Sequence, residues 1–156
     1  MEILKFNKSN SNIYKEFINR YNKIIEFDIL NIQTFNIGEK EIFLVVDKGI
    51  IRKYKILAYA IIEKDLEYLY IVNSISRNYQ NDGTTIFISD FMVKKDSRNI
   101  GIGTKLARYL IDDIYREKNI ILQPDEDGYS FWKKFSFDDD KESKKRTWRI
   151  KSNRRW

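Results

Sequence analysis

Cysteine and histidine are both absent from the 156 residues of this chain, and their absence excludes several kinds of chemistry. Disulfide bonds, a cysteine nucleophile, an imidazole base and an ordinary zinc site each need one of these side chains. Acid–base chemistry must therefore fall to Asp, Glu, Tyr, Lys, a chain terminus or water. Proline occurs once, at Pro124, and the sequence has no Pro/Gly/Ser-rich linker and no internal repeat. We therefore expect one domain over residues 1–156, long enough to bury a core.

Long apolar runs are missing as well. The longest, Ile56–Ile62, has seven residues, whereas a helix needs roughly 20 to span a bilayer. The first residues lack the basic, apolar, small-residue order of a signal peptide. We therefore expect a cytoplasmic protein that does not bind a membrane. Apolar residues at 42% and aromatic residues at 15% of the chain argue against disorder.

Most of the chain has no net charge, because the whole net charge of +6 lies at the C-terminal end. Residues 1–132 carry 19 basic and 19 acidic side chains, whereas residues 133–156 carry 10 basic and 4 acidic ones, an excess of 10 − 4 = +6. A basic end can attract phosphate, acidic protein or nucleic acid. A solvated strand edge guarded by Lys and Arg has the same composition. Nucleic acid is therefore a partner that the sequence allows without favouring it.

Hydrophobic patterns divide the chain into strands and helices. Strands are expected at Glu2–Phe6, Glu41–Val46, Lys53–Ile62, Thr84–Val93, Asn119–Leu122, Phe135–Phe137 and Thr147–Ile150. Helices are expected from Ser9 or Ser11 to about Ile25, within Phe27–Thr34, from Gly101 to about Glu117 and after Asp125. Leu66–Ile75 favours a further strand or a strand extension. This order predicts an α+β fold whose mixed sheet is antiparallel in its first half and then contains one crossover.

The most informative segment is the glycine turn that follows Thr84–Val93, a strand apolar on both faces. Arg98-Asn-Ile-Gly101-Ile-Gly103-Thr104 opens a helix whose Ile102, Leu106, Leu110 and Ile114 recur every four residues, as expected for a buried stripe. Backbone N–H groups at such a turn point at one spot. With the positive end of the helix dipole behind them, they form an anion site suited to a diphosphate. The turn therefore indicates a phosphate-bearing ligand.

This arrangement resembles the GNAT (Gcn5-related) N-acetyltransferase superfamily. The family's acyl-CoA loop reads Arg/Gln-x-x-Gly-x-Gly/Ala, as does Arg98-x-x-Gly101-x-Gly103, and its next helix often reads Phe-Tyr-x-Lys-x-Gly-Phe, similar to Phe131-Trp-Lys-Lys-Phe-Ser-Phe137. The resemblance is tightest over residues 84–137, and the order of the upstream elements extends it to nearly the whole chain. It implies a single GNAT-like domain of three-layer α/β type, with a mixed, mostly antiparallel sheet flanked by helices.

The resemblance implies acetyl-CoA as co-substrate, no metal, and direct attack of a primary amine of a small molecule, peptide or protein on the thioester. The residues implied to hold the CoA diphosphate are Asn99, Ile100, Gly101, Ile102, Gly103 and Thr104 through their N–H groups, with Arg98 adding charge. The two glycines matter because side chains would block the approach of the ligand. Phe91, Met92 and Val93 are implied to lie along the pantetheine, and an N–H near Met92 or Val93 to polarise the thioester carbonyl.

The sequence departs from the family pattern on the second helix. Trp132, implied to lie at the cofactor, replaces the tyrosine that often protonates the departing thiolate. An indole N–H donates a hydrogen bond but does not usefully deliver a proton. Ser136 replaces the motif glycine, and Asp125 stands where members often have Asn. The general acid is thus unassigned; Tyr129, one turn earlier, is either a substitute for it or a core or surface aromatic.

Asp90 is the best candidate for the general base, because it interrupts a buried strand. Alternation places it on one face with Ile86, Ile88 and Met92. Desolvation would raise the pKa of its carboxyl toward a useful value. The alternative is an Asp that satisfies backbone groups at a bulge. Glu63 is a weaker second base, and the adjacent carboxylates Asp138–Asp140 are expected to be a solvated loop and not a metal site.

Two other functions stay open beside a general N-acetyltransferase. A toxin-type acetyltransferase acting on charged tRNA is favoured by the basic end and disfavoured by Trp132. A CoA-binding module that has lost catalysis is favoured by the lack of an obvious acid. A plain nucleic-acid binder lacks a recognition motif. The sequence identifies no acceptor and allows either a monomer or a homodimer.

Overall fold

The computed structural model describes residues 1–6, 40–48, 54–72, 79–124, 126–139 and 149–151. The helices expected before residue 35 lie outside the described residues, as does Lys53, the first residue of the strand expected at Lys53–Ile62. The chain forms two compact units. The first unit is Met1–Ile61 with Asp90–Ala107, and the second unit is Ile62–Ser89 with Arg108–Trp156. One domain over the whole chain stays a prediction.

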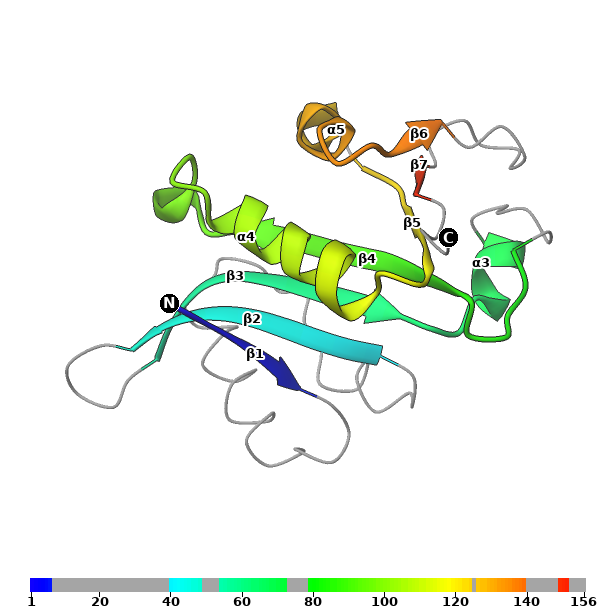
Figure 1. Ribbon diagram of the computed structural model, residues 1–156, viewed down its shortest axis with the longest axis horizontal. Helices are drawn as coiled ribbons and strands as arrows, with labels where there is room; N and C mark the ends of the chain where they lie inside the picture. The colour runs from blue at the N-terminus through cyan, green and yellow to red at the C-terminus, as the bar shows by residue number, and fades with distance from the viewer. Residues whose placement is uncertain (7–39, 49–53, 73–78, 125, 140–148, 152–156) are drawn as a thin grey trace. The chain divides into compact units, whose positions relative to one another are not determined.

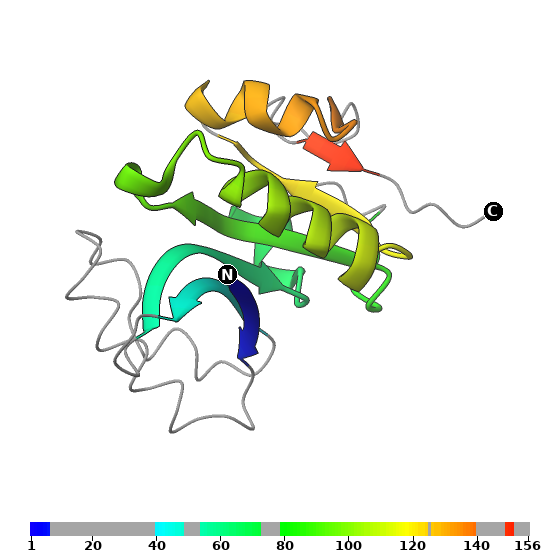
Figure 2. The same cartoon turned by 60° about the vertical axis from the view of Figure 1, so that its left-hand side comes forward.

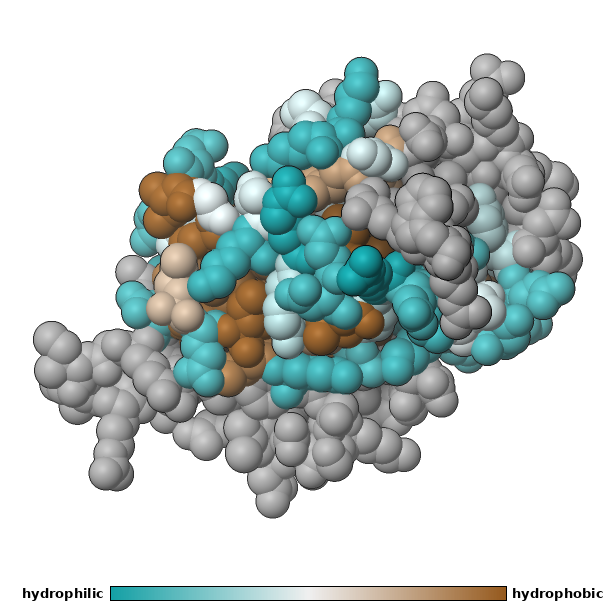
Figure 3. Space-filling view, viewed as in Figure 1, coloured by the Kyte–Doolittle hydropathy of each residue, from teal (hydrophilic) through white to brown (hydrophobic). Residues whose placement is uncertain are grey.

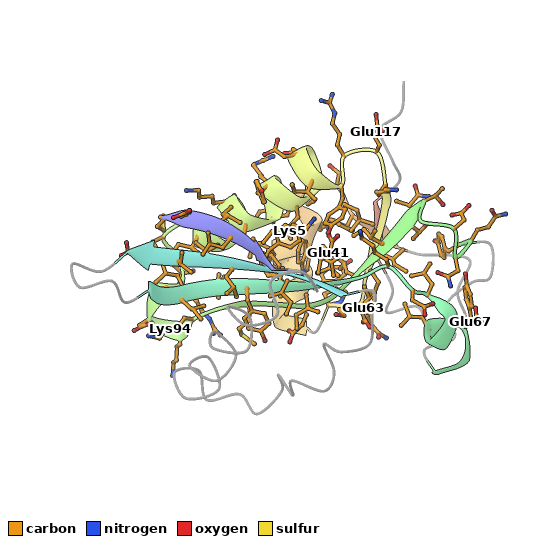
Figure 4. All side chains as sticks on the ribbon, turned by 90° about the horizontal axis from the view of Figure 1, so that it is seen from below. Lys5, Glu41, Glu63, Glu67, Lys94 and Glu117 are labelled. Carbon is orange, nitrogen blue, oxygen red and sulfur yellow. The ribbon has the colours of Figure 1, made fainter. Side chains whose placement is uncertain are left out.

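Strands dominate the first unit: β1 (Glu2–Phe6), β2 (Lys40–Lys48), most of β3 (Tyr54–Glu63) and the end of β4 (Thr85–Val93) (Figure 1). β1 pairs antiparallel with β2, from Glu2 opposite Val46 to Phe6 opposite Ile42. Lys5 on β1 and Glu41 on β2 form an ion pair at 3.3 Å (Figure 4). Ile42–Val46 and Ile56–Ile62 are buried throughout, so both faces of β2 and β3 are covered.

The second unit contains the crossover. The first half of β4 pairs in parallel with β5 (Asn119–Leu122), from Thr85 opposite Asn119 to Ile88 opposite Leu122. β7 (Arg149–Lys151) runs antiparallel beside β5 (Figure 2), and β6 (Asp138–Asp139) pairs with β7. The seven described strands follow the order β1-β2-β3-β4-β5-β7-β6. The prediction of an α+β fold with a mixed sheet and one crossover is confirmed.

The strand predicted at Leu66–Ile75 is wrong, because this segment contains the helix α3 (Glu67–Val72). The carboxylate of Asp65 accepts the N–H of Glu67 at 3.0 Å, and the N–H of Leu69 donates to the carbonyl of Leu66 at 3.0 Å. Leu66 and Leu69, three residues apart, are both fully buried beside Tyr79. Capping and tertiary burial thus override a strand-like composition.

The helix after the glycine turn was predicted correctly in place but not in form. α4 (Ile102–Arg108) continues as a π-helical turn at Tyr109–Ile114, in which the N–H of Tyr115 donates to the carbonyl of Leu110. A π turn contains more residues than an α turn. After Leu110 and Ile111, the next buried residue is therefore Tyr115, at 4% exposure, whereas Ile114, which the four-residue spacing placed in the buried stripe, is 38% exposed.

The strand predicted at Phe135–Phe137 is also wrong. α5 (Glu126–Lys133) is followed by a tight turn in which Phe135 N–H donates to the Trp132 carbonyl and Ser136 N–H to the Lys133 carbonyl. Ser136 has a φ of +64°, in the left-handed region. The chain therefore becomes extended three residues later than predicted, at β6.

Hydrophilic side chains cover most of the described surface on the face drawn in Figure 3. The large hydrophobic side chains exposed among the described residues are Met1, Ile100, Ile114 and Tyr129. In the described part of the chain, no helix is long and apolar enough to cross a membrane.

Candidate functional site

The glycine turn takes two left-handed backbone positions in the first unit. β4 leads through a 3-10 turn at Lys95–Ser97 into the loop, which then enters α4 (Figure 1). Asn99 has a φ of +63° and Gly101 a φ of +86°. Asn tolerates the left-handed region, whereas β-branched residues there are strained. A Cβ at Gly101 would have no heavy atom within 4 Å, so this side of the loop is open to a ligand.

Gly101 also marks the start of the helix. Its carbonyl accepts the N–H of Lys105 at 3.0 Å, the first bond of the helical ladder. The N–H groups of the first turn, at Ile102, Gly103 and Thr104, have no acceptor within the helix, which is a property of every helix start. Gly103 is buried in this turn, and the exposed Ile100 lies between the two left-handed positions. The loop therefore combines two left-handed positions with a helix start, and the binding of an anion there stays a prediction.

Arg98 folds back onto the end of β4. Its Nε donates to the carbonyl of Val93 at 2.9 Å, and its guanidinium lies 3.6 Å from the sulfur of Met92. The side chain is otherwise exposed. Arg98 thus ties the loop to the strand, and a contact between its charge and a phosphate stays a prediction.

β4 extends past its pairing with β5. The parallel register covers Thr85–Ile88, and the strand continues through Ser89–Val93. Burial changes at the same point, from fully buried residues to partly buried ones. The N–H of Lys94 donates to the carbonyl of Leu57 at 2.8 Å, which keeps the end of β4 beside β3. Phe91, Met92 and Val93 therefore lie on a partly exposed strand end, which the 3-10 turn joins to the loop.

Asp90 is joined to a residue that sequence reasoning missed. The hydroxyl of Tyr59 on β3 donates to Oδ2 of Asp90 at 2.8 Å, and both residues belong to the first unit. Tyr59 is fully buried, whereas Asp90 is only partly buried. The pair therefore links the interior of this unit to its partly exposed strand end.

Burial is the largest influence on the pKa of both residues of this pair. Desolvation raises the pKa of the Asp90 carboxyl, and the hydrogen bonds from the Tyr59 hydroxyl and the Phe91 N–H oppose that rise. Desolvation also raises the pKa of Tyr59, and the negative charge of Asp90 adds to the effect. Tyr59 is therefore a neutral donor over the working pH range. Asp90 is a carboxylate that takes a proton more readily than an ordinary Asp does.

The predicted site residues fall into two groups. Those of the first unit are Asp90, Phe91, Met92, Val93 and the loop Arg98–Thr104, which one strand end and one helix start bring together. Tyr129 and Trp132 belong to the second unit, on α5. Tyr129 is 39% exposed. Its role as an acid and the cofactor contact of Trp132 stay predictions.

Trp132 packs in an aromatic cluster of the second unit. Its ring lies edge-on to Phe131 at 5.0 Å and to Phe137 at 5.5 Å between centroids, and Phe135 is 6.0 Å away. Trp132 itself is 6% exposed. Its side chain therefore holds α5 against the following segment.

Replacing Trp132 by Ala is expected to destabilise the fold by about 3–5 kcal/mol, the usual cost of deleting a buried aromatic side chain. Chemical denaturation followed by circular dichroism measures this change. Lys133→Ala is the matched control, because Lys133 is the next residue of α5 and is exposed; it should change stability by less than about 0.5 kcal/mol. Equal losses in the two variants would show that the cluster does not stabilise α5.

The remaining predicted residues are Glu63, Asp125 and Asp138–Asp140. Glu63, the second base candidate, is the last residue of β3 and is 4% exposed. Asp138 and Asp139 form the short strand β6 and not the loop that was predicted for them, and Asp140 lies outside the described residues. Asp125, the expected helix cap, is also outside them, although α5 begins at the next residue.

The chain belongs to the acetyltransferase (GNAT) family, whose sequence profile matches residues 11–137. The predicted family membership is thereby confirmed, and the match spans both β4 and the loop. None of the curated proteins matches the sequence significantly.

Several solved structures share the fold. NAA60 from Arabidopsis thaliana, in complex with a bisubstrate analogue, is 15% identical with a TM-score of 0.58, over 98% of this chain and 99% of that chain. The aminoglycoside acetyltransferase meta-AAC0020 from an uncultured soil metagenomic sample, in complex with sisomicin, is 15% identical with a TM-score of 0.52, over 86% and 85%. A chain of the KacTA–DNA complex is 10% identical with a TM-score of 0.53, over 90% and 79%. At these identities the similarity establishes the fold alone.

Proposed function

We propose that this acetyltransferase-family chain transfers the acetyl group of acetyl-CoA to a primary amine by direct attack. The observation that carries the proposal is the loop from Arg98 to Thr104, with left-handed positions at Asn99 and Gly101, which one 3-10 turn joins to the partly exposed end of β4. The open space at Gly101, where any other residue would project a side chain, supports a diphosphate at this loop.

The residues that would hold the co-substrate are those of the loop and of the strand end. The N–H groups from Asn99 to Thr104 would bind the diphosphate, and Phe91–Val93 would lie along the pantetheine. Bound acetyl-CoA supplies a thioester whose carbonyl carbon is open to attack. A backbone N–H at Met92 or Val93 would donate to the carbonyl oxygen, and such a donor contributes about 3–4 kcal/mol in acyl transfer.

Asp90 is the proposed general base. A lysine-like amine has a pKa of about 10.4, so most of it is protonated near neutral pH and its lone pair is blocked. Asp90 would accept the ammonium proton on a carboxylate oxygen, which frees the nitrogen lone pair for attack. Burial of Asp90 raises its pKa and makes it a better proton acceptor than an exposed Asp.

The acceptor is proposed to be a primary amine of a small molecule, peptide or protein. One neighbour supports an amine, because it is bound to the aminoglycoside sisomicin. The KacTA–DNA complex and the basic C-terminal end leave nucleic acid as a less favoured partner. Tyr129 is the proposed acid for the thiolate.

Release of free thiol from acetyl-CoA in the presence of a panel of amines tests the proposal. The panel holds aminoglycosides, N-terminal peptides and lysine analogues, and mass spectrometry identifies the N-acetyl product. The matching alcohols and a reaction without acceptor are the controls. We expect thiol release to depend on one class of amines. Saturable acetyl-CoA binding without transfer to any amine would contradict the proposal and support a CoA-binding module.

A further inference from the structure

The Tyr59–Asp90 pair is the one place in the described residues where a buried hydroxyl is hydrogen-bonded to a carboxylate on the proposed catalytic strand. Tyr59 lies in the middle of β3, in a run that is otherwise apolar from Ile56 to Ile62. Asp90 lies at the point where β4 passes from buried to partly buried. Each strand therefore contributes one polar side chain, and the two side chains form a hydrogen bond.

A tyrosine hydroxyl that is removed from solvent can donate its hydrogen bond to an acceptor that carries no charge. Tyr70 in the second unit, which is partly buried, donates its hydroxyl to the backbone carbonyl of Tyr79, and this bond buries no charge. Pairing Tyr59 with Asp90 instead places a desolvated negative charge in the row that alternation shares with Ile86, Ile88 and Met92. An arrangement that is costly for stability and lies on the strand of the proposed chemistry is typical of a functional site.

We infer that Tyr59 is a positioning residue, whose hydroxyl fixes the Asp90 carboxylate on β4 so that it can take the proton of the acceptor amine. The inference rests on the proposed function. The step is balanced: an N–H bond of the ammonium breaks, an O–H bond forms on Asp90, and the nitrogen keeps the electron pair that attacks the carbonyl carbon.

The geometry leaves the carboxylate room for this proton. A carboxylate has about four acceptor positions on its two oxygens. Tyr59 occupies one, on Oδ2, and the Phe91 N–H is the second donor acting on the group. Among the described residues no other titratable group shifts the ionisation of Asp90. Tyr59 therefore stabilises the ionised form, against the desolvation that disfavours it.

The sign of the pH effect follows from these contacts. Tyr59→Phe removes a donor to the charged form, so the pKa of Asp90 should rise above its already raised value. The acidic limb of kcat/KM for acetyl transfer should then move to higher pH. At a pH on that limb we expect a loss of about tenfold or more, the size of one hydrogen bond to a charged group. The KM for acetyl-CoA should not change.

The test compares the pH profiles of wild type, Tyr59→Phe and Tyr70→Phe with the best amine of the panel. Tyr70→Phe is the matched control, since it removes a hydroxyl hydrogen bond to a carbonyl and not to a carboxylate. In an Asp90→Asn background, Tyr59→Phe should have no further effect on the rate, because the two residues act through one group. An unmoved limb in Tyr59→Phe, or an equal loss in the Asn background, overturns the inference.

A second readout does not depend on turnover. The carboxyl carbon of Asp90, labelled with ¹³C and assigned by its loss in Asp90→Asn, reports its own titration by NMR. Tyr59→Phe should move that titration to higher pH and Tyr70→Phe should not. An unchanged titration in folded Tyr59→Phe overturns the inference. A shifted titration in a wild type that acetylates no amine would uphold the contact and refute the proposed function instead.

Discussion

Asp90→Asn is expected to lower kcat/KM for acetyl transfer by roughly 10²–10⁴-fold, the contribution of a positioned general base. The variant should keep its fold. Because the folded-state pKa of Asp90 is raised, the protonated form of Asp90 stabilises the fold. This contribution is present at low pH and is lost as the pH rises through the folded-state pKa. The Asp90→Asn variant, which has an uncharged amide at this position, should therefore melt at the wild-type temperature or above it near neutral pH. The side-chain oxygen of that amide can still accept a hydrogen bond from the Tyr59 hydroxyl.

Initial rates over a pH series measure the effect. The acidic limb that Asp90 creates should disappear, and the remaining rate should rise toward the pKa of the amine as free amine accumulates. Asp96→Asn is the control, because Asp96 is exposed in the same unit and pairs only with Lys94, at 3.6 Å, in the contacts described. That change should leave the rate unaltered. Wild-type rates in folded Asp90→Asn would remove Asp90 from the mechanism.

Gly101→Val is expected to weaken acetyl-CoA binding by roughly 100-fold, equivalent to losing one or two hydrogen bonds to a charged group. Two effects combine. The new side chain would enter the open space beside the loop, and a β-branched residue at a φ of +86° shifts the backbone that aims the N–H groups. The strain alone should cost about 2 kcal/mol of stability.

Gly83→Val separates binding from strain. Gly83 has the same φ of +86° and also has no heavy atom within 4 Å of its Cβ position, but it lies outside the loop, before β4. Both variants should melt at similarly reduced temperatures without ligand. Acetyl-CoA at 100 times the wild-type Kd should stabilise wild type and Gly83→Val by about 2.7 kcal/mol, and Gly101→Val hardly at all. Equal stabilisation of the two variants would exclude the loop as the cofactor site.

Strands with strong local patterns could be predicted from the sequence, and helices governed by tertiary contacts could not. β1 and β5 have the predicted bounds, and β4 begins one residue later than predicted. α3 was missed because its aromatic and β-branched residues favour a strand until Asp65 caps the segment and Leu69 packs against Leu66. The π turn was missed because no spacing rule for an α-helix anticipates five-residue bonding.

The candidate site divides in the same way. The loop could be predicted because a glycine requirement and a helix start are both local in sequence. The Tyr59–Asp90 pair could not, because its members lie 31 residues apart. One signal was present: Tyr59 is the residue with a hydrogen-bonding side chain in the run Ile56–Ile62, and a buried tyrosine hydroxyl usually has a partner. The sequence did not indicate which partner.

Calorimetric titration of the purified wild-type chain with acetyl-CoA tests the central claim most directly, since the loop must first be a working co-substrate site. Titrations with CoA and with ADP show which part of the ligand is bound. We predict saturable binding at one site, with CoA competing for it and ADP binding more weakly through its diphosphate. No heat of binding and no competition, in a sample shown to be folded, would contradict the account.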